Sequence, residues 1–477
     1  MIDLGLLKIE FLLCALIGIL FIVDLLTEQK DILKRLAAVG SFVVLAYSFF
    51  GQPAGTTFFD MYVADGFSAL LKTLFLLTVF ITILVSFDFL KKNPRFTGEY
   101  FILLLSATLG MILMVSSQEM ITFYVSLELL SISSYILSAY QKPNPKSTEA
   151  GIKYFLLGAM ASGILLFGIS LVYGATGTLY FSEIAAATTN PSSAILYVGV
   201  ALILIALSFK IAVVPFHMWV PDVYEGAPTP VVAFFSVGTK MAGFAVLMRL
   251  FLMAFGNLKA EWGMIMAVLS AVTIVLGNIL AIPQTNIKRF MGYSSIAQAG
   301  YILMGLAVAS FSGISACLFY LVAYLFSNLC AFVVIIIFSG KIESDDIEAY
   351  RGLSKRSPLL ALSLLIALMS LGGVPPLVGF LGKLYLFSSA VESGFTWLVV
   401  IGVLMSVVSI YYYLMILKRV YIEPLEGSLP IVLSPVEKFV LLICISGTVI
   451  LGIVPYPVFE HILPITQSFF STLALPL

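Results

Sequence analysis

The sequence predicts an all-helical, polytopic membrane protein with about fourteen membrane-spanning helices. Hydrophobic residues make up 61% of the chain and charged residues only 10%, whereas an ordinary soluble domain carries roughly 25% charge. The apolar runs last about 20 residues, which is the length that crosses a hydrocarbon core of roughly 30 Å. They do not alternate apolar and polar residues as barrel strands do, so we expect the spans to be helices.

Charged or Gly/Pro-rich segments separate the apolar runs and set the predicted span boundaries. The first seven spans are predicted at 5–26, 35–52, 66–90, 99–116, 120–140, 151–175 and 194–214. The second seven are predicted at 228–255, 262–282, 292–310, 312–339, 358–391, 396–421 and 435–457. The chain is thus expected to form one integral membrane domain, 1–477, with segments 1–98, 99–255, 262–421 and 435–477.

The placement of basic residues predicts the orientation, because cytoplasmic loops are enriched in Lys and Arg. The loops leaving odd-numbered spans hold 18 of the 25 Lys and Arg residues, and the loops leaving even-numbered spans hold Lys259 alone. We therefore expect both termini on the non-cytoplasmic side.

Composition also excludes several kinds of partner. The net charge is zero and there is no basic patch, so nucleic acid is not an expected partner. The cysteines are scattered singly in apolar runs, which predicts buried thiols and no metal site. They are Cys14, Cys317, Cys330 and Cys444. No nucleotide, flavin or iron–sulfur motif is present, so no cofactor is expected in this chain.

Three basic residues near span ends need no special role. Lys8, Lys72 and Arg249 are each expected to extend towards the membrane surface, with the charged end in water. The acids near span ends are interpreted in the same way. They are Asp24, Asp60, Asp65, Glu99 and Glu119.

Three other lysines lie where a charge is costly, since an ionised group at the centre of a span costs roughly 2.5–3.5 kcal/mol on insertion scales. Lys240 and Lys383 are deep in their spans. Lys210 lies five residues before Pro215, where a broken helix would expose carbonyl groups that can hold a cation. For Lys210, extension to the cytoplasmic surface is the alternative.

Glu128 is the one deep carboxylate, about eight residues into the fifth span. Its expected partner is one of the buried lysines. A purely structural pair is the alternative, but three lysines against one acid make a poor stabilising device. Because burial disfavours the charged form of lysine, such groups can lose and regain protons, and water can bridge them into a proton path.

A long motif, Pro215 to Pro230 (PFHMWVPDVYEGAPTP), resembles a signature of the proton-translocating membrane subunits of complex I. Its variant at 223–228, VYEGAP, is similar to the subunit N branch of that family. Segments 124–131, 292–301 and 374–383 resemble the same branch.

The resemblance implies the antiporter-like fold, with two inverted five-helix repeats (spans 4–8 and 9–13) and breaks in spans seven and twelve. A faint internal match agrees with it, because Leu204–Leu207 precedes Pro215 by the same interval as Leu365–Leu368 precedes Pro376. The residues expected at the breaks are Pro215, Gly372, Gly373, Pro375 and Pro376.

The resemblance also implies roles in proton translocation. Glu128 matches the family's carboxylate on span five and Lys210 its partner on span seven. Lys240 matches the central lysine of the relay, and Lys383 the terminal lysine on span twelve. Lys153, at the mouth of span six, is assigned from the resemblance alone.

Span eleven lacks the charged groups that the related L and M subunits carry. The relay is then expected to use Tyr320, Tyr324, Ser327, Asn328 or ordered water, with no ranking among them. His217 has two interpretations, a titrating group at the cytoplasmic mouth or a loop residue that fixes the turn between spans seven and eight.

The expected function is that of a proton-translocating membrane-arm subunit of an NADH–quinone oxidoreductase in a bacterial cytoplasmic membrane. Flavin, iron–sulfur clusters and quinone would be bound by other subunits, and the expected neighbours are an M-type subunit and small membrane subunits. The alternatives are an ion-translocating subunit of a cation/proton antiporter, membrane-bound hydrogenase or ferredoxin-linked complex, and a passive scaffold.

Overall fold

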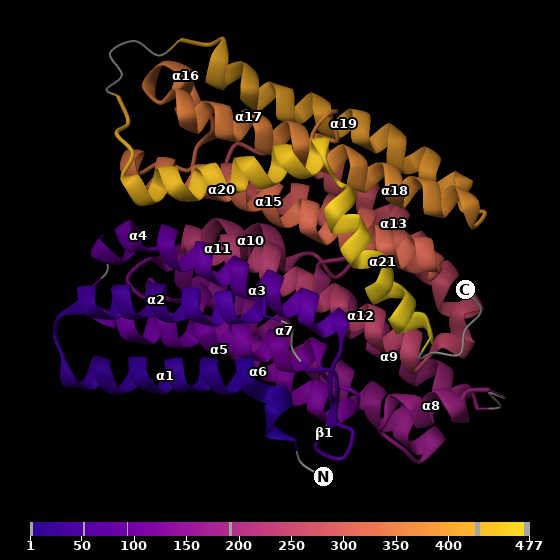
Figure 1. The fold of residues 1–477 in the computed structure, drawn as a ribbon. Helices are drawn as coiled ribbons and strands as arrows, with labels where there is room; N and C mark the ends of the chain where they lie inside the picture. Colours follow the sequence, from indigo (N-terminus) through magenta and orange to yellow (C-terminus); the bar gives the residue numbers. More distant parts are fainter. Residues whose placement is uncertain (1–2, 51–52, 93, 190–192, 425–429, 472–477) are drawn as a thin grey trace. The chain divides into compact units, whose positions relative to one another are not determined.

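The computed structural model describes residues 3–50, 53–92, 94–189, 193–424 and 430–471 (Figure 1). Residues 51–52 of the second predicted span and 472–477 of the predicted C-terminal segment lie outside these ranges. The chain forms two compact units. Unit 1 comprises Met1–Ile211, Gly226–Trp262 and Gln467–Leu477, and unit 2 comprises Ala212–Glu225 and Gly263–Thr466.

Unit 1 is built from helices and one antiparallel hairpin in its described part. Its elements are η1 (Leu4–Leu7), α1 (Lys8–Leu26), α2 (Lys30–Ser48), β1 (Gly55–Thr57), β2 (Tyr62–Ala64), α3 (Gly66–Val85), α4 (Phe87–Lys92), η2 (Pro94–Phe96), α5 (Thr97–Val115), α6 (Met120–Ser138), α7 (Pro145–Thr176), α8 (Phe181–Ala187), α9 (Ala194–Ile211), α11 (Thr229–Phe234), η3 (Phe235–Thr239), α12 (Lys240–Met253) and η4 (Gly256–Leu258).

In the described part of unit 2, every helix or strand that is assigned is a helix. Its elements are α10 (Trp219–Gly226), α13 (Lys259–Ala281), α14 (Ile287–Val308), α15 (Phe311–Ile342), η5 (Ile347–Tyr350), α16 (Leu353–Arg356), α17 (Pro358–Gly372), α18 (Val378–Glu392), α19 (Thr396–Tyr421), α20 (Pro435–Ile453) and α21 (Tyr456–Ser471), of which α10, α13 and α21 cross the boundary between the units.

The prediction of an all-helical membrane protein is confirmed. Among the described residues, eleven helices are long and apolar enough to cross a membrane. The remaining predicted spans are also helical, as α2, α14 and the pair α17 and α18. Most boundaries agree within a few residues. Helix α7 begins at Pro145, earlier than the predicted 151, so Lys153 lies two turns inside a helix instead of at its mouth.

Both predicted helix breaks are present. Residues 212–218 separate α9 from α10, and residues 373–377 separate α17 from α18. The first residue of each break has a left-handed backbone, with φ of 63° at Ala212 and 84° at Gly373. The cis peptide bonds found in the described chain lie in the same two segments, at Val214–Pro215 and Pro375–Pro376. The two breaks therefore share backbone geometry as well as sequence spacing.

The eighth predicted span contains a local irregularity. Helix α11 continues into α12 through η3, a single π-helical turn over Phe235–Thr239. Single π turns inside α-helices are frequent at functional sites. This one ends immediately before Lys240.

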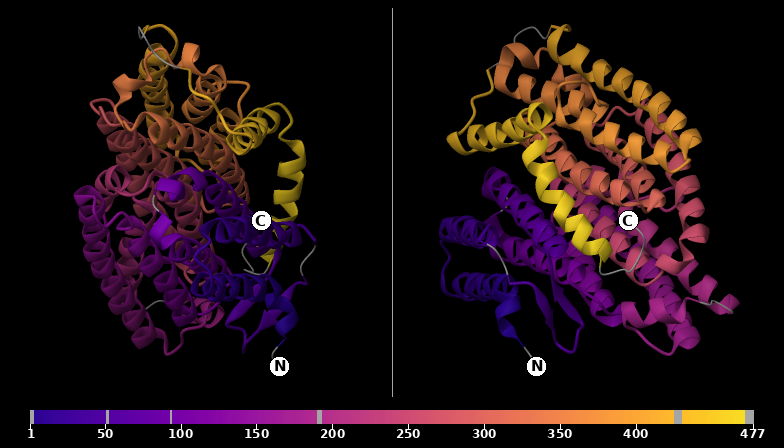
Figure 2. Two further views of the ribbon diagram at one scale, coloured as in Figure 1. Left: turned by 90° about the vertical axis from the view of Figure 1, so that its left-hand side faces the viewer. Right: turned by 45° about the vertical axis from the view of Figure 1, so that its right-hand side comes forward.

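One end of unit 1 is covered by the hairpin, and we call it the hairpin end. Strand β1 pairs with β2, with Thr57 opposite Tyr62. Helices α1, α2, α3 and α5 lie side by side in unit 1 (Figure 1), and the strands lie beside the N-terminal turn η1 in the views of Figure 2. The residues at the start of α1 and of α3 are thereby shielded by a segment outside both helices.

Candidate functional site

In unit 1, the two residues expected to interact directly, Glu128 and Lys210, each form a hydrogen bond with a different serine. Lys210, in the last turn of α9, is 5% exposed, and its Nζ donates a hydrogen bond of 3.1 Å to the Ser131 hydroxyl on α6. Glu128 lies one turn earlier on α6 and accepts a hydrogen bond from the Ser162 hydroxyl of α7. The carboxylate still acts electrostatically on the ammonium group. Lys210 is thus buried, and does not extend to the cytoplasmic surface.

Ser131 carries no charge in a span rich in serine, so the sequence offered no sign of its part in this contact. Residues three apart on a helix share a face. The Glu128 carboxylate and the Ser131 hydroxyl therefore lie on the same face of α6. Lys210 donates its hydrogen bond to the hydroxyl.

The end of α9 lies closely against α12. A Cβ atom added to Gly243 would come within 2.5 Å of Ile211 Cγ2 and 3.7 Å of Lys210 Cγ, so this close approach requires glycine. Lys240 lies one turn from Gly243 on α12 and is 2% exposed. Unit 1 therefore places Lys210 against the helix that carries Lys240.

Lys153 differs from the other predicted residues. Its side chain is 41% exposed and forms an ion pair of 2.6 Å with Glu149, four residues earlier on α7. It lies on the same helix as Ser162, the partner of Glu128, but nine positions before it. Its role stays a prediction that rests on the resemblance.

In unit 2, Lys383 occupies the break in span twelve. Its Nζ donates to the carbonyl oxygen of Gly372 (3.3 Å) and to the Ser406 hydroxyl (3.2 Å), and it lies 4.4 Å from the centre of the Tyr301 ring. The Ser406 hydroxyl in turn donates to the Tyr301 hydroxyl at 3.2 Å. Each of these partners is electrically neutral, although Lys383 is only 3% exposed.

The neighbouring carbonyl of the break binds Gln298 of α14. Gln298 Nε2 donates to the Leu371 oxygen (3.0 Å), while its Oε1 accepts a hydrogen bond of 2.5 Å from the Tyr320 hydroxyl. Helix ends leave carbonyls without intrahelical partners, and here two successive ones hold an amide and an ammonium group. Gln298 was missed as a site residue, and its only signal was an amide within an apolar run.

The other residues proposed for span eleven have different surroundings. The Ser327 hydroxyl is 2.8 Å from the Ser370 hydroxyl, which also accepts from the Gly379 amide at 3.1 Å. The Tyr324 hydroxyl is buried and has no hydrogen-bond partner within the described ranges. Asn328 is buried. Tyr320 is therefore the member of the set that Gln298 connects to the break.

His217 lies in the break of span seven, two residues after Pro215. Its carbonyl accepts the hydrogen bond from Val220 that opens α10. Its Nδ1 is buried without a hydrogen-bond partner among the residues that the structure describes. The hydrogen bond from Val220 to the His217 carbonyl agrees with a role in forming the turn. A titrating role for the imidazole stays a prediction.

The acidic residues of the long motif form a clamp within unit 2. Asp222 and Glu225, one turn apart on α10, contact Arg289 of α14 at 2.6 and 3.2 Å. The sequence did not indicate this pairing, because 64 or more residues separate the partners.

Two basic residues expected to extend to the surface do not, and that expectation is wrong. Lys72 is 0% exposed and forms an ion pair with Glu10 at 2.9 Å. Arg249 is 1% exposed and contacts Asp65 at 2.9 Å. The expectation assumed that the ends of spans reach water. Here Tyr62 of β2 contacts Lys72. The rings of Phe67 and Phe469 flank Arg249. Asp65, expected to have no special role, also caps α3.

Among the described residues, no group of three or more His, Cys, Asp or Glu side chains could hold a metal ion.

Comparisons with known proteins agree with the fold. The family described as "NADH:quinone oxidoreductase/Mrp antiporter, TM" matches residues 117–409. A chain of respiratory complex I from Thermus thermophilus superposes with a TM-score of 0.82 at 33% identity, covering 95% of this chain and 99% of that one. A chain of the Mrp complex from Dietzia shares the fold with a TM-score of 0.87, covering 97% of both chains, at 20% identity.

These likenesses define the class as the antiporter-like membrane subunits. "NADH-quinone oxidoreductase subunit N" of Moorella thermoacetica is 44% identical over 474 residues, covering 98% of this chain and all of that one. The chain belongs to the NADH-quinone oxidoreductase subunit N family. The antiporter alternative is not favoured, because the Mrp likeness extends to the fold alone.

Proposed function

We propose that the chain translocates protons across the membrane as the subunit N component of an NADH–quinone oxidoreductase, through Glu128, Lys210, Lys240 and Lys383. The observation that carries the proposal is the setting of Lys383, a buried lysine bound to a carbonyl, a hydroxyl and a ring face. A lysine held by neutral groups can release its proton without leaving an unpaired carboxylate behind.

The arrangement in unit 1 supports an electrostatic trigger. The Glu128 charge stabilises the Lys210 ammonium without a direct ion pair, so a change at Glu128 alters Lys210 while the Ser131 bond persists. When the influence of Glu128 is withdrawn, Lys210 releases its proton towards Lys240. The signal that changes Glu128 arrives from neighbouring subunits along the chain of buried charges.

The arrangement in unit 2 supports a further proton station of the relay. Lys383, Ser406 and Tyr301 form a connected set of proton donors and acceptors. Gln298 and Tyr320 form a second set at the adjacent carbonyl. Ordered water completes the path, and Lys153 assists proton entry. His217, Tyr324, Ser327 and Asn328 are proposed as accessory groups.

The wider assembly is part of the same proposal. Electron transfer to quinone takes place in other subunits, which hold the flavin and the iron–sulfur clusters. An M-type antiporter-like subunit and small membrane subunits are the neighbours. The complex resides in a bacterial cytoplasmic membrane, and both termini of this chain lie on the non-cytoplasmic side.

The test uses Glu128→Gln and Lys240→Ala in the assembled complex, reconstituted into vesicles. We expect fewer protons pumped per electron pair passed to quinone, with electron transfer preserved when an uncoupler is present. Glu261→Gln is the control, because that carboxylate is exposed in the first turn of α13. Unchanged pumping in both test variants contradicts the proposal.

A further inference from the structure

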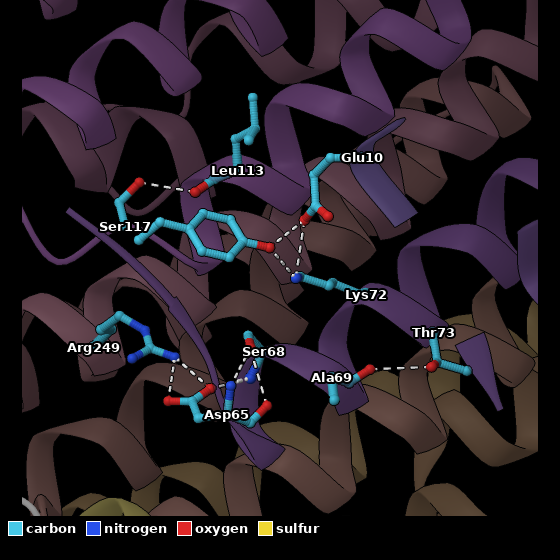
Figure 3. A network of polar contacts seen from close by, with 10 residues as sticks. Glu10, Asp65, Ser68, Ala69, Lys72, Thr73, Leu113, Ser117 and Arg249 are labelled. Carbon is cyan, nitrogen blue, oxygen red and sulfur yellow. Dashed lines mark hydrogen bonds and ion pairs between the residues drawn. The ribbon is translucent and has the colours of Figure 1, made fainter. Parts of the chain in front are cut away.

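A second buried cluster of ionisable groups lies at the hairpin end of unit 1, apart from the residues used above. Figure 3 shows Glu10 and Lys72 pointing towards one another, with Arg249 directed at Asp65 nearby. Glu10 comes from the first turn of α1, Lys72 from the second turn of α3, and Tyr62 from β2.

Glu10, Tyr62 and Lys72 form a closed triangle of polar contacts. The Tyr62 hydroxyl donates to Glu10 Oε1 at 2.5 Å, Lys72 Nζ donates to the Tyr62 oxygen at 2.6 Å, and Lys72 Nζ lies 2.9 Å from Glu10 Oε1. The exposed fractions are 4% for Glu10 and Tyr62 and 0% for Lys72. All three groups can therefore exchange protons without entering solvent.

One atom of the cluster is left unused. Both donors bind Glu10 Oε1, while Oε2 is buried with no hydrogen-bond partner within the described part of the chain. A buried polar atom without a partner is costly and calls for an explanation. A pair that served only to stabilise the fold would gain by using both oxygens, and apolar residues of similar size would serve as well or better.

The surrounding charges make the cluster neutral overall. The Asp65 carboxylate accepts two hydrogen bonds of 2.9 Å from Arg249, whose guanidinium lies 5.1 and 5.6 Å from the ring centres of Phe67 and Phe469. This second pair acts electrostatically on Lys72. The two carboxylates and the two basic groups have opposite charges that sum to zero. One added proton would therefore give the whole cluster a net charge of +1.

We propose that Glu10, Tyr62 and Lys72 form a proton-binding site at the hairpin end of unit 1, which takes up the translocated proton before its release. The inference rests on the proposed function. Arg249 lies nine positions beyond Lys240 on α12, about 13.5 Å along the helix axis. The cluster is thus attached to the relay helix, displaced from Lys240 towards the hairpin end.

The proton transfer balances with water as the only further reactant. In loading, an O–H bond of a hydronium ion delivered along the water path breaks as an O–H bond forms at Glu10 Oε2, and the Lys72 ammonium stays bound to the Tyr62 hydroxyl. Release breaks that O–H bond, restores the carboxylate and gives the proton to water. Within the unloaded site, an N–H bond of Lys72 can break as Tyr62 accepts its proton and passes its own to Glu10 Oε1, which yields neutral amine and acid.

The test compares Glu10→Gln and Tyr62→Phe with Leu113→Ala in the complete complex. The first two variants remove a proton acceptor and a hydroxyl at nearly constant shape. Leu113 packs against a hydrophobic cluster of Leu6, Leu7, Tyr62 and Ala64, so it lies beside the site, and it carries no ionisable group. We expect fewer protons pumped per electron pair in Glu10→Gln, slower pumping in Tyr62→Phe, and wild-type pumping in Leu113→Ala.

Infrared difference spectra give a second readout, which a structural role would not produce. During turnover, wild-type complex is expected to show a protonated carboxyl band that Glu10→Gln lacks. Should Glu10→Gln not assemble, a pumping rate of Tyr62→Phe equal to wild type overturns the inference. An equal loss in Leu113→Ala, or wild-type pumping and spectra in Glu10→Gln, also overturns it.

The parallel Glu128→Gln variant separates this inference from the proposed function. Loss of pumping in Glu128→Gln together with wild-type pumping in Glu10→Gln removes the hairpin-end site and leaves the proposed relay intact. Wild-type pumping in Glu128→Gln, Glu10→Gln and Lys240→Ala contradicts both the proposed relay and the hairpin-end site.

Discussion

Lys383 donates a hydrogen bond to the carbonyl of Gly372 across the break in span twelve, and the residue of the break that allows this is Gly373. Gly373 has a φ of 84°, and an added Cβ there would lie 3.1 Å from Lys383 Cδ and 3.7 Å from its Nζ. The backbone of the break and the lysine side chain are therefore fitted to one another.

Lys383→Met should abolish the part of proton pumping that passes through unit 2. Methionine keeps the unbranched shape but supplies no proton, so the Gly372 and Ser406 partners lose their donor. The measurement is the number of protons pumped per electron pair in vesicles. Leu384→Met is the matched control, because Leu384 is the next residue and is 46% exposed.

Gly373→Ala should destabilise the chain by about 1–2 kcal/mol, since a left-handed backbone costs an L-residue roughly that amount. It should also disturb Lys383, so pumping should fall further than in a variant of equal stability. Thermal unfolding in detergent and pumping assays check both effects. Gly163→Ala is the control, with no heavy atom within 4 Å of an added Cβ. Equal unfolding temperatures and equal pumping in the two variants would contradict the close packing of Gly373 against the Lys383 side chain.

Ser131→Ala should slow pumping without preventing assembly, because it removes the hydroxyl that holds the Lys210 ammonium. The variant leaves Glu128 and its Ser162 partner in place. Ser134→Ala serves for comparison, since that hydroxyl donates to the Leu130 carbonyl of its own helix. The rate of proton uptake, followed with a pH dye, should distinguish the two.

Glu348 should contribute stability that depends on pH. It lies in η5, outside the spans, and the Arg419 guanidinium that donates a hydrogen bond of 2.7 Å holds the pKa of this carboxyl below its ordinary value of 4.5. A lowered pKa in the folded chain means that the stabilisation is present above pH 4.5 and is lost as pH falls through the folded value.

The Glu348→Gln variant should accordingly unfold at a lower temperature than wild type near neutral pH. The difference should shrink below pH 4.5 as wild-type Glu348 becomes protonated. Melting curves over a pH series in detergent provide the measurement, with Glu28→Gln as the control carboxylate. A difference that stays constant down to the acid range would show that the Arg419 contact does not depend on charge.

Sequence patterns predicted the spans and both breaks because hydrophobic length and proline position act locally along the chain. They also singled out Lys210, Lys240 and Lys383, since charge in an apolar run is conspicuous. Ser131 and Gln298 were missed because uncharged polar residues cost little in a span and give no comparable signal. Contacts across 79 and 73 residues connect them to their partners.

The error at the hairpin end has a different cause. Depth was judged from distance to the nearest predicted span end, which says nothing about what covers that end. The cover comes from β1 and β2, short strands in a connecting segment, and from Glu10, 62 positions before Lys72. A contact of this kind depends on how helices are arranged in three dimensions, and local patterns along the sequence do not reveal that arrangement.

The π-helical turn before Lys240 determines how a change of length in this segment would affect the direction of that lysine. A helix advances by about 100° for each residue, and a π turn accommodates one residue more than the regular α-helical hydrogen-bond pattern. If evolution or an experimenter removed one residue from Phe235–Thr239, the composition of the span would barely change. With that residue gone, the π turn can close as a regular α-helical turn, and Lys240 keeps nearly its present direction relative to α11. A residue removed from a turn that is already α-helical would instead rotate the side chains that follow by about 100°.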